Sequence, residues 1–184
     1  KMGRITGHSE VYRVVDERIP QFGFQGARHL ILNQAEGQVH TGKLMQTLLQ
    51  KALDAGVRIF NGFEIKSLED SSQGVEIETV AGWTLRVPKV LVAVNGFARQ
   101  LLPGLDVQPA RNQVLITHPI PNLRVKGCFH YDRGYFYFRN IDGRILLGGG
   151  RNLDFETEKT EDFGANPKIR QALTELLHTV ICPG

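Results

Sequence analysis

Residues 133–149 have the sequence RGYFYFRNIDGRILLGG, which predicts a β-hairpin. Two runs rich in aromatic and branched residues flank the turn-forming pair Asp142-Gly143. Successive side chains of a strand point to opposite faces, so the phenylalanines of the first run face one side of the sheet and its tyrosines and arginine face the other. The residues expected on this tyrosine face are Tyr135, Tyr137 and Arg139.

The tyrosine face of the hairpin has the chemistry of a carboxylate-binding site. The Arg139 guanidinium can donate two parallel hydrogen bonds to a carboxylate, and a phenol from Tyr135 or Tyr137 can add another. The alternative is a half-exposed strand whose tyrosines only pack over the sheet. The pattern by itself favours neither interpretation.

More strands and a helix are expected around the hairpin. Residues 113–117 and 127–131 have β-type composition, and the acidic stretch 154–162 predicts a solvated loop. After Asn166-Pro167, a pair typical of a helix start, apolar residues recur at helical spacing and predict an amphipathic helix. Its apolar positions are Ile169, Ala172, Leu173, Leu176, Leu177 and Val180.

The first half of the chain combines one clear helix with several short strands. Apolar residues repeat at helical spacing over 42–55, with Thr41 placed to cap the helix and Gly56 placed to end it. The first 25 or so residues fit a short helix or a strand equally well, until Pro20 interrupts the pattern. Three or four antiparallel strands are predicted after the helix. Their runs are 57–60, 64–68, 75–80 and 83–87.

Residues 90–94, VLVAV, are apolar at every position, which is typical of a strand covered on both faces. The strand is expected to end at Asn95-Gly96 and to be followed by a short helix over 97–102. A glycine at the end of such a strand lets a ligand approach the backbone, because no Cβ blocks it. The alternative is an ordinary turn between a strand and a helix.

The composition is that of a globular protein. The chain has 184 residues, of which 41% are hydrophobic and 22% are charged, enough for one domain or two small subdomains. No apolar run approaches the roughly 20 residues of a membrane helix and no signal-peptide pattern is found, so we expect a cytoplasmic protein without a membrane partner. The formal net charge is only +3 and the basic residues are scattered, which argues against a nucleic-acid partner.

The motifs of several enzyme classes are absent from the sequence. The glycines at 148–150 lack the last glycine of the dinucleotide-binding GxGxxG pattern, and no GxSxG, HExxH or Walker lysine motif is present. Cys128 and Cys182 stand at no zinc-ligand spacing, and we expect both to be buried small hydrophobic residues. No metal site is predicted, and the patterns identify no catalytic residue.

Taken in order, several segments resemble the D-amino-acid oxidase (DAO) type of FAD-dependent oxidoreductase, the group that includes glycine and sarcosine oxidases. The resemblance runs from about residue 36 to the end of the chain and lies in the order of the segments. They are QVHTGKL at 38–44, GFEI at 62–65, VAVNGF at 92–97, PARNQV at 109–114, and the strands at 135–139 and 144–149.

The resemblance implies an α+β fold, with an antiparallel β-sheet substrate domain, flanking helices and part of a FAD/NAD(P)-binding, Rossmann-like domain. Residues 1–35 would form an N-terminal segment of uncertain structure, 36–108 a partial FAD-binding subdomain with a β-meander, and 109–184 the substrate-domain hairpins and the C-terminal helix. The family's GxGxxG unit and its closing segment are not found in the sequence. We therefore expect a central fragment of a longer enzyme, inactive by itself.

The resemblance also implies an activity and a site. The parent enzyme would oxidise a small amine or amino acid by hydride transfer to FAD, the cofactor that supplies the redox chemistry. Asn95 stands where the family has a threonine, a change that leaves a backbone role intact. The implied contacts are Tyr135, Tyr137 and Arg139 for the substrate, and Ile65, Asn95 and Gly96 for the cofactor.

Two other functions are compatible with the sequence. A standalone, non-enzymatic β-rich domain would bind a peptide or a sugar on the tyrosine face and use no cofactor. A flavoprotein of the same fold would act on a 2-hydroxy acid or a polyol. No pattern specifies the substrate, the electron acceptor, the mode of flavin attachment or the oligomeric state.

Overall fold

The computed structural model describes residue 7 and residues 10–183 of the chain. The chain divides into two compact units. Unit 1 comprises Lys1–Thr41, Asn112–Glu158 and Phe163–Gly184, and unit 2 comprises Gly42–Arg111 and Lys159–Asp162.

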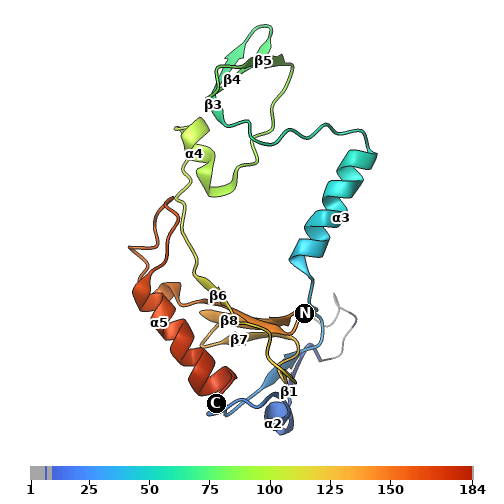
Figure 1. Ribbon diagram of the computed structural model, residues 1–184, viewed down its shortest axis with the longest axis vertical. Helices are drawn as coiled ribbons and strands as arrows, with labels where there is room; N and C mark the ends of the chain where they lie inside the picture. Colours follow the sequence, from blue (N-terminus) through green and yellow to red (C-terminus); the bar gives the residue numbers. More distant parts are fainter. Residues whose placement is uncertain (1–6, 8–9, 184) are drawn as a thin grey trace. The chain divides into compact units, whose positions relative to one another are not determined.

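Unit 1 is built on a four-stranded antiparallel sheet (Figure 1). Its central strands, β8 (Phe136–Ile141) and β9 (Arg144–Gly149), form the hairpin predicted from the sequence. β6 (Val114–Ile116) pairs with β9 and β7 (Cys128–Tyr131) pairs with β8. The order across the sheet is therefore β6-β9-β8-β7.

A two-residue turn joins β8 to β9. Asp142 has a φ of 46° and Gly143 a φ of 71°, so both residues are left-handed. Two-residue hairpin turns of this kind match the right-handed twist of the strands, and Asp-Gly is a preferred pair for them. The turn sets the register of the hairpin, in which Phe138 pairs with Leu147.

Helix α5 (Pro167–Leu176) lies along the sheet and continues as a π-helical turn over Leu177–Ile181 (Figure 1). Asn166 caps the helix, because its side chain accepts hydrogen bonds from the backbone amides of Lys168 and Ile169. Each leucine or isoleucine buried between helix and sheet contributes about 1.5–3 kcal/mol. The buried core residues of sheet and helix are Phe136, Phe138, Ile145, Leu147, Ile169, Leu173, Leu176, Leu177 and Ile181.

The N-terminal segment of unit 1 contains the short antiparallel strands β1 (Tyr12–Val14) and β2 (Ile31–Asn33). A 3₁₀ turn at Asp16–Arg18 and helix α2 (Ile19–Phe22) lie between them in the sequence. Pro20 stands in the first turn of α2, where the missing amide hydrogen costs nothing. The expectation that Pro20 interrupts the local pattern is therefore wrong, since this proline helps to begin a helix.

Aromatic rings pack this segment against the sheet. The Phe24 ring meets the Phe129 ring edge-on at 5.2 Å, and Phe129 stacks on Phe138 at 4.9 Å. The backbone amide of Gln25 also donates to the carbonyl of Val180 at 3.0 Å. Residues near the start of the chain are thus held by residues near its end.

Unit 2 contains helix α3 (Thr41–Asp54) and a three-stranded antiparallel meander of β3 (Ile65–Ser71), β4 (Gly74–Thr79) and β5 (Thr84–Val87). The predicted helix over 42–55 and the predicted antiparallel strands are confirmed. Residues 57–60 form no strand, so the meander has three strands rather than four.

The predicted strand over 90–94 does not form, and the expectation of burial on both faces is wrong. These residues have no regular structure, and Leu91 is 90% exposed. A strand needs a neighbour that pairs with its backbone, and within the described part of the chain no strand pairs with this run. The expected short helix follows as a 3₁₀ turn at Asn95–Phe97 and helix α4 (Ala98–Leu101).

Unit 2 exposes many large apolar side chains. Helix α3 buries no residue, and in this unit only Thr79 and Pro109 are buried among the residues that the structure describes. No helix in the described ranges is long and apolar enough to cross a membrane. The exposed apolar set consists of Leu44, Met45, Leu48, Leu49, Leu53, Val57, Ile59, Phe60, Phe63, Val80, Trp83, Leu85, Val90, Leu91, Val94, Phe97 and Leu105.

Candidate functional site

The face of the unit 1 sheet opposite the buried core carries the polar residues of β8, and we call it the open face. Tyr137 and Arg139 lie on it, as the sequence predicts, while the phenylalanines of β8 are buried on the other side. Tyr137 pairs with His130 of β7 and with Gly148 of β9, and Arg139 pairs with Cys128 of β7. Side chains from β7 and β8 therefore meet on this face, beside the glycine of β9.

Tyr137 is half-buried. Burial raises the pKa of its phenol above the usual 10.0, so the hydroxyl keeps its proton at neutral pH. The side-chain amide of Asn112 donates to the Tyr137 hydroxyl at 3.4 Å. The phenol therefore lies at the surface of the open face with a hydrogen to donate.

The Arg139 guanidinium donates hydrogen bonds to backbone carbonyls of its own unit. Its Nη1 donates to the carbonyl of Val39 at 2.6 Å, and its Nε donates to the carbonyl of Asn140 at 3.4 Å. Among the described residues, Nη2 has no hydrogen-bond partner. The guanidinium is held in place, and one of its amino groups is available to a ligand.

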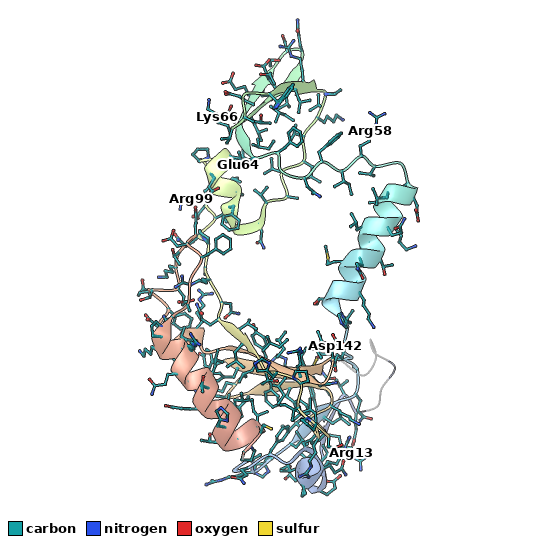
Figure 2. All side chains as sticks on the ribbon, in the orientation of Figure 1. Arg13, Arg58, Glu64, Lys66, Arg99 and Asp142 are labelled. Carbon is teal, nitrogen blue, oxygen red and sulfur yellow. The ribbon has the colours of Figure 1, made fainter. Side chains whose placement is uncertain are left out.

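The segment just before α3 is fastened to the end of the hairpin by two further contacts. The Gln38 side-chain amide donates to the carbonyl of Asn140 at 2.9 Å, and His40 Nε2 lies 3.7 Å from Asp142 Oδ2. Asp142, in the turn between β8 and β9, is labelled in Figure 2. Together with the Arg139–Val39 bond, these contacts attach residues 38–40 to one end of the open face.

Tyr135 lies just before the strand, so its place on the tyrosine face stays a prediction. The residue belongs to the turn between β7 and β8, and β8 begins only at Phe136. The preceding residues 132–134 all have positive φ, which the alternating pattern of an extended strand does not allow. Tyr135 is exposed at the entry to β8, so its side-chain direction is not set by the strand alternation.

Two chemically reactive residues of the open face were missed by the sequence analysis. His130 lies directly across from Tyr137, and Cys128 lies across from Arg139. Cys128 is exposed, which contradicts the expectation of a buried small residue. The signal was available, because alternation over 127–131 places these two side chains on the face opposite Phe129.

A buried polar network anchors the start of β6. Glu158 is fully buried, and its carboxylate accepts from the side-chain amide of Gln113 at 2.9 Å and from that of Asn166 at 3.1 Å. The amide of Asn166 also donates to Asp154 at 3.0 Å. The acidic stretch 154–162 is therefore not a wholly solvated loop, because Glu158 turns inward to bind two amide donors.

In unit 2, the predicted cofactor residues Asn95 and Gly96 form the turn before α4. Asn95 is exposed and left-handed, with a φ of 54°. A Cβ built at Gly96 would lie 3.2 Å from the Pro109 Cβ, so the missing side chain makes room for Pro109. The Phe97 amide is already bonded to the carbonyl of Val94 at 3.1 Å. The turn can meet a ligand through Asn95, whereas the side of Gly96 that lacks a Cβ faces Pro109.

The third predicted cofactor residue, Ile65, begins β3. It pairs with Thr79, and a bulge separates it from Ser67 in the strand register. A shallow cavity of about 300 Å³ lies in the same unit, and none of the three predicted cofactor residues is in its wall. The cavity is lined by Arg99, Gln100, Pro103 and Glu161, and Figure 2 labels Arg99 beside α4.

Comparison with protein families identifies the class of this protein. Residues 4–184 match the DAO family of FAD dependent oxidoreductases, and the chain belongs to this family. The match extends beyond the segments from which the resemblance was first inferred, and it confirms that resemblance.

Curated relatives include N-methyl-L-tryptophan oxidases. The protein of Yersinia pestis (strain Pestoides F) is 26% identical over 97 residues, which are 53% of this chain and 26% of the relative. The protein of Yersinia pseudotuberculosis serotype O:1b (strain IP 31758) gives the same values. The matched part thus spans about a quarter of the length of these relatives.

Solved structures of similar fold include three redox enzymes. Iminodiacetate oxidase from Chelativorans sp. BNC1 has a TM-score of 0.75 at 17% identity, over 98% of this chain and 50% of that one. L-proline dehydrogenase from P. horikoshii has a TM-score of 0.70 at 16% identity, over 92% of this chain and 48% of that one. Glycine oxidase from Geobacillus kaustophilus has a TM-score of 0.68 at 17% identity, over 94% of this chain and 47% of that one. These likenesses confirm an α+β fold with antiparallel sheets, and the chain spans about half of each structure.

Proposed function

We propose that this chain is part of a FAD-dependent enzyme that oxidises a small amine or amino acid. Membership of the FAD dependent oxidoreductase family supports the cofactor and the reaction type. The names of the relatives support the substrate class, because N-methyl-L-tryptophan, iminodiacetate and glycine all carry an amine and a carboxylate. The observation that carries the proposal is the open face, where a phenol and a guanidinium lie two residues apart on one strand.

The open face supplies the groups that such a substrate needs. Arg139 is fixed through Nη1 and Nε, and Nη2 would donate to the substrate carboxylate. The protonated Tyr137 hydroxyl would donate to the same carboxylate or accept from the substrate amine. Tyr135, exposed at the entry to β8, would border the site. These side chains would bind and orient the substrate, and FAD, when bound, would supply the capacity to oxidise the carbon that bears the nitrogen.

Unit 2 would contribute only part of the cofactor site. The exposed left-handed turn at Asn95 and the first residue of β3, Ile65, would lie along the FAD, with Gly96 shaping the turn against Pro109. The sequence has no GxGxxG loop to bind the pyrophosphate at a helix N-terminus. We therefore propose that this chain alone binds FAD weakly and is inactive.

The exposed apolar set of unit 2 supports the same proposal. Isolated exposed leucines are ordinary, but a helix that buries none of its apolar stripe has lost its main source of stability. Residues 90–94 are likewise apolar throughout and unpaired in the described ranges. In a longer enzyme, a further segment would cover the apolar stripe of α3 and pair with the backbone of residues 90–94.

The visible absorption spectrum tests this proposal. We would compare the 184-residue chain with the protein encoded by the complete open reading frame, each with and without added FAD. Flavin bands in the longer protein, bleached anaerobically by an N-methyl amino acid or by glycine, are expected. If a 2-hydroxy acid bleaches the flavin bands and no amine does, the protein is instead a flavoprotein that oxidises 2-hydroxy acids. A longer protein that shows no flavin bands after FAD has been added and the unbound FAD removed would exclude an oxidase and favour a binding module.

A further inference from the structure

The outer end of the Tyr137 side chain lies where a side chain at position 148 would have to be. A Cβ built on Gly148 falls 2.6 Å from both Cζ and Oη of Tyr137 and 2.9 Å from its Cε2. Real Cβ atoms essentially never come closer than about 3.0 Å to another heavy atom. The phenol therefore leans over β9 and occupies the space left by the missing side chain of its cross-strand partner.

The backbone of Gly148 does not itself require glycine. Its φ lies outside the left-handed region, in contrast to Gly149 with a φ of 110° and Gly150 with a φ of 74°. Glycine in the interior of a strand weakens that strand unless another group approaches it closely. At position 148 the group that approaches is the phenol ring of Tyr137.

A second contact holds the same phenol from the β6 side. Asn112 donates to the Tyr137 hydroxyl at 3.4 Å. The residue after it, Gln113, is buried, bonds Glu158 through its side chain at 2.9 Å and accepts the Gly149 amide on its carbonyl at 3.1 Å. Asn112 therefore directly precedes a residue that hydrogen bonds hold to a buried carboxylate and to β9.

We propose that Gly148 and Asn112 are positioning residues, which fix the Tyr137 hydroxyl on the open face, where it would bind an amino-acid carboxylate together with Arg139. Gly148 acts by leaving space for the ring, and Asn112 acts by bonding its hydroxyl. On the neighbouring strand β7, the titratable side chain paired with Tyr137 is that of His130. This inference rests on the proposed function, because it assigns a substrate role to Tyr137.

The first test concerns the position of the ring and needs no cofactor. We would measure urea denaturation and tyrosine ring NMR signals of the 184-residue chain carrying G148A, Y137L or both. The sequence has only four tyrosines, so Y137L identifies the Tyr137 signals. G148A should lower the urea midpoint and shift the Tyr137 signals, whereas in the Y137L background it should leave the midpoint unchanged or raise it.

Gly37→Ala is the matched control, because nothing lies within 4 Å of a Cβ at that position and its φ is not left-handed. It should leave the Tyr137 signals in place. Equal destabilisation by G148A in both backgrounds, or Tyr137 signals that do not move, would overturn the inference.

The second test concerns the substrate and uses the FAD-loaded protein encoded by the complete open reading frame. G148A and N112A should each raise KM for the amine substrate about tenfold with kcat changed less than about twofold, and G148A should add nothing in the Y137L background. An unchanged KM in an active enzyme would overturn the positioning role alone. Failure to bind FAD would overturn the proposed function and the substrate role with it. The ring signals show which has failed.

Discussion

Gly149, unlike its neighbour Gly148, is required by the backbone. Its φ of 110° is in a region that side chains rarely adopt, and a Cβ there would collide with the carbonyl oxygen of Tyr135. We expect G149A to destabilise unit 1 by more than about 3 kcal/mol, because strain and overlap add. Urea denaturation of the chain measures this, with G37A as a control that should change the free energy of unfolding by less than about 0.5 kcal/mol. A G149A midpoint equal to that of G37A would contradict it.

Arg139 has a structural contact and a proposed ligand, and the two can be separated. Replacing Arg139 by Ala removes the bond to the Val39 carbonyl, which should cost about 1–2 kcal/mol in urea denaturation. In the FAD-loaded enzyme it should also raise KM by the equivalent of roughly 2–3 kcal/mol, through loss of charge-assisted bonds. Arg170→Ala, on the exposed side of α5, is the control for both. An unchanged KM would remove Arg139 from the substrate site.

Tyr137 should make the stability of unit 1 sensitive to alkaline pH. Burial raises the pKa of its phenol, so the folded chain holds this proton more tightly than the unfolded chain does. The contribution is complete below the unfolded value of about 10 and is lost as pH rises through the higher folded value. Urea midpoints measured from about pH 8 to pH 11 should fall more steeply for the native chain than for Y137F. Equal slopes would contradict this.

Among the secondary structure elements, α5 depends most on a single side chain at its start. Asn166 accepts from two backbone amides of the first turn, and its amide also donates to the buried Glu158. We expect N166A to cost about 2 kcal/mol or more, because the cap is lost and a buried carboxylate loses a donor. Thermal or urea unfolding measures it, and Arg170→Ala should be close to neutral. If N166A and R170A have the same free energy of unfolding, the expected contribution of Asn166 to stability is wrong.

Elements whose stabilising contacts are local could be predicted from the sequence. The Asp142-Gly143 turn, the 42–55 helix and the helix after Asn166 follow from capping, turn and periodicity rules. The 90–94 run could not, because whether an apolar stretch becomes a strand depends on a neighbour elsewhere in the chain. The inward turn of Glu158 depends in the same way on two distant amides.

The candidate site was predictable to the extent that strand alternation determines it. Tyr137 and Arg139 share a face as expected, and the same rule applied to β7 would have added His130. Tyr135 falls outside the strand, because the positive φ of the residues before it delays the start of β8 by one position. The position of the Tyr137 ring over Gly148 could not be predicted from the sequence, because it depends on which residues pair across the hairpin.

The two units should differ in how firmly they are folded. Unit 1 buries a continuous core between its sheet and α5, whereas α3 and the 90–94 run bury almost nothing. Hydrogen exchange should therefore protect amides of β8, β9 and α5 strongly and those of α3 weakly. Urea should melt α3 before the sheet. Equal protection in both units would contradict the assignment of the core to unit 1.

The chain path of unit 1 has a consequence for its synthesis on the ribosome. Gln25 bonds to Val180, and Phe24 packs on Phe129 and Phe138, so this segment lacks its partners until more than a hundred further residues have been translated. The meander of unit 2, whose strands pair with near neighbours, can form while those partners are still inside the exit tunnel. A nascent chain released before α5 emerges would hold a formed meander beside an unpaired N-terminal segment, a natural target for a chaperone.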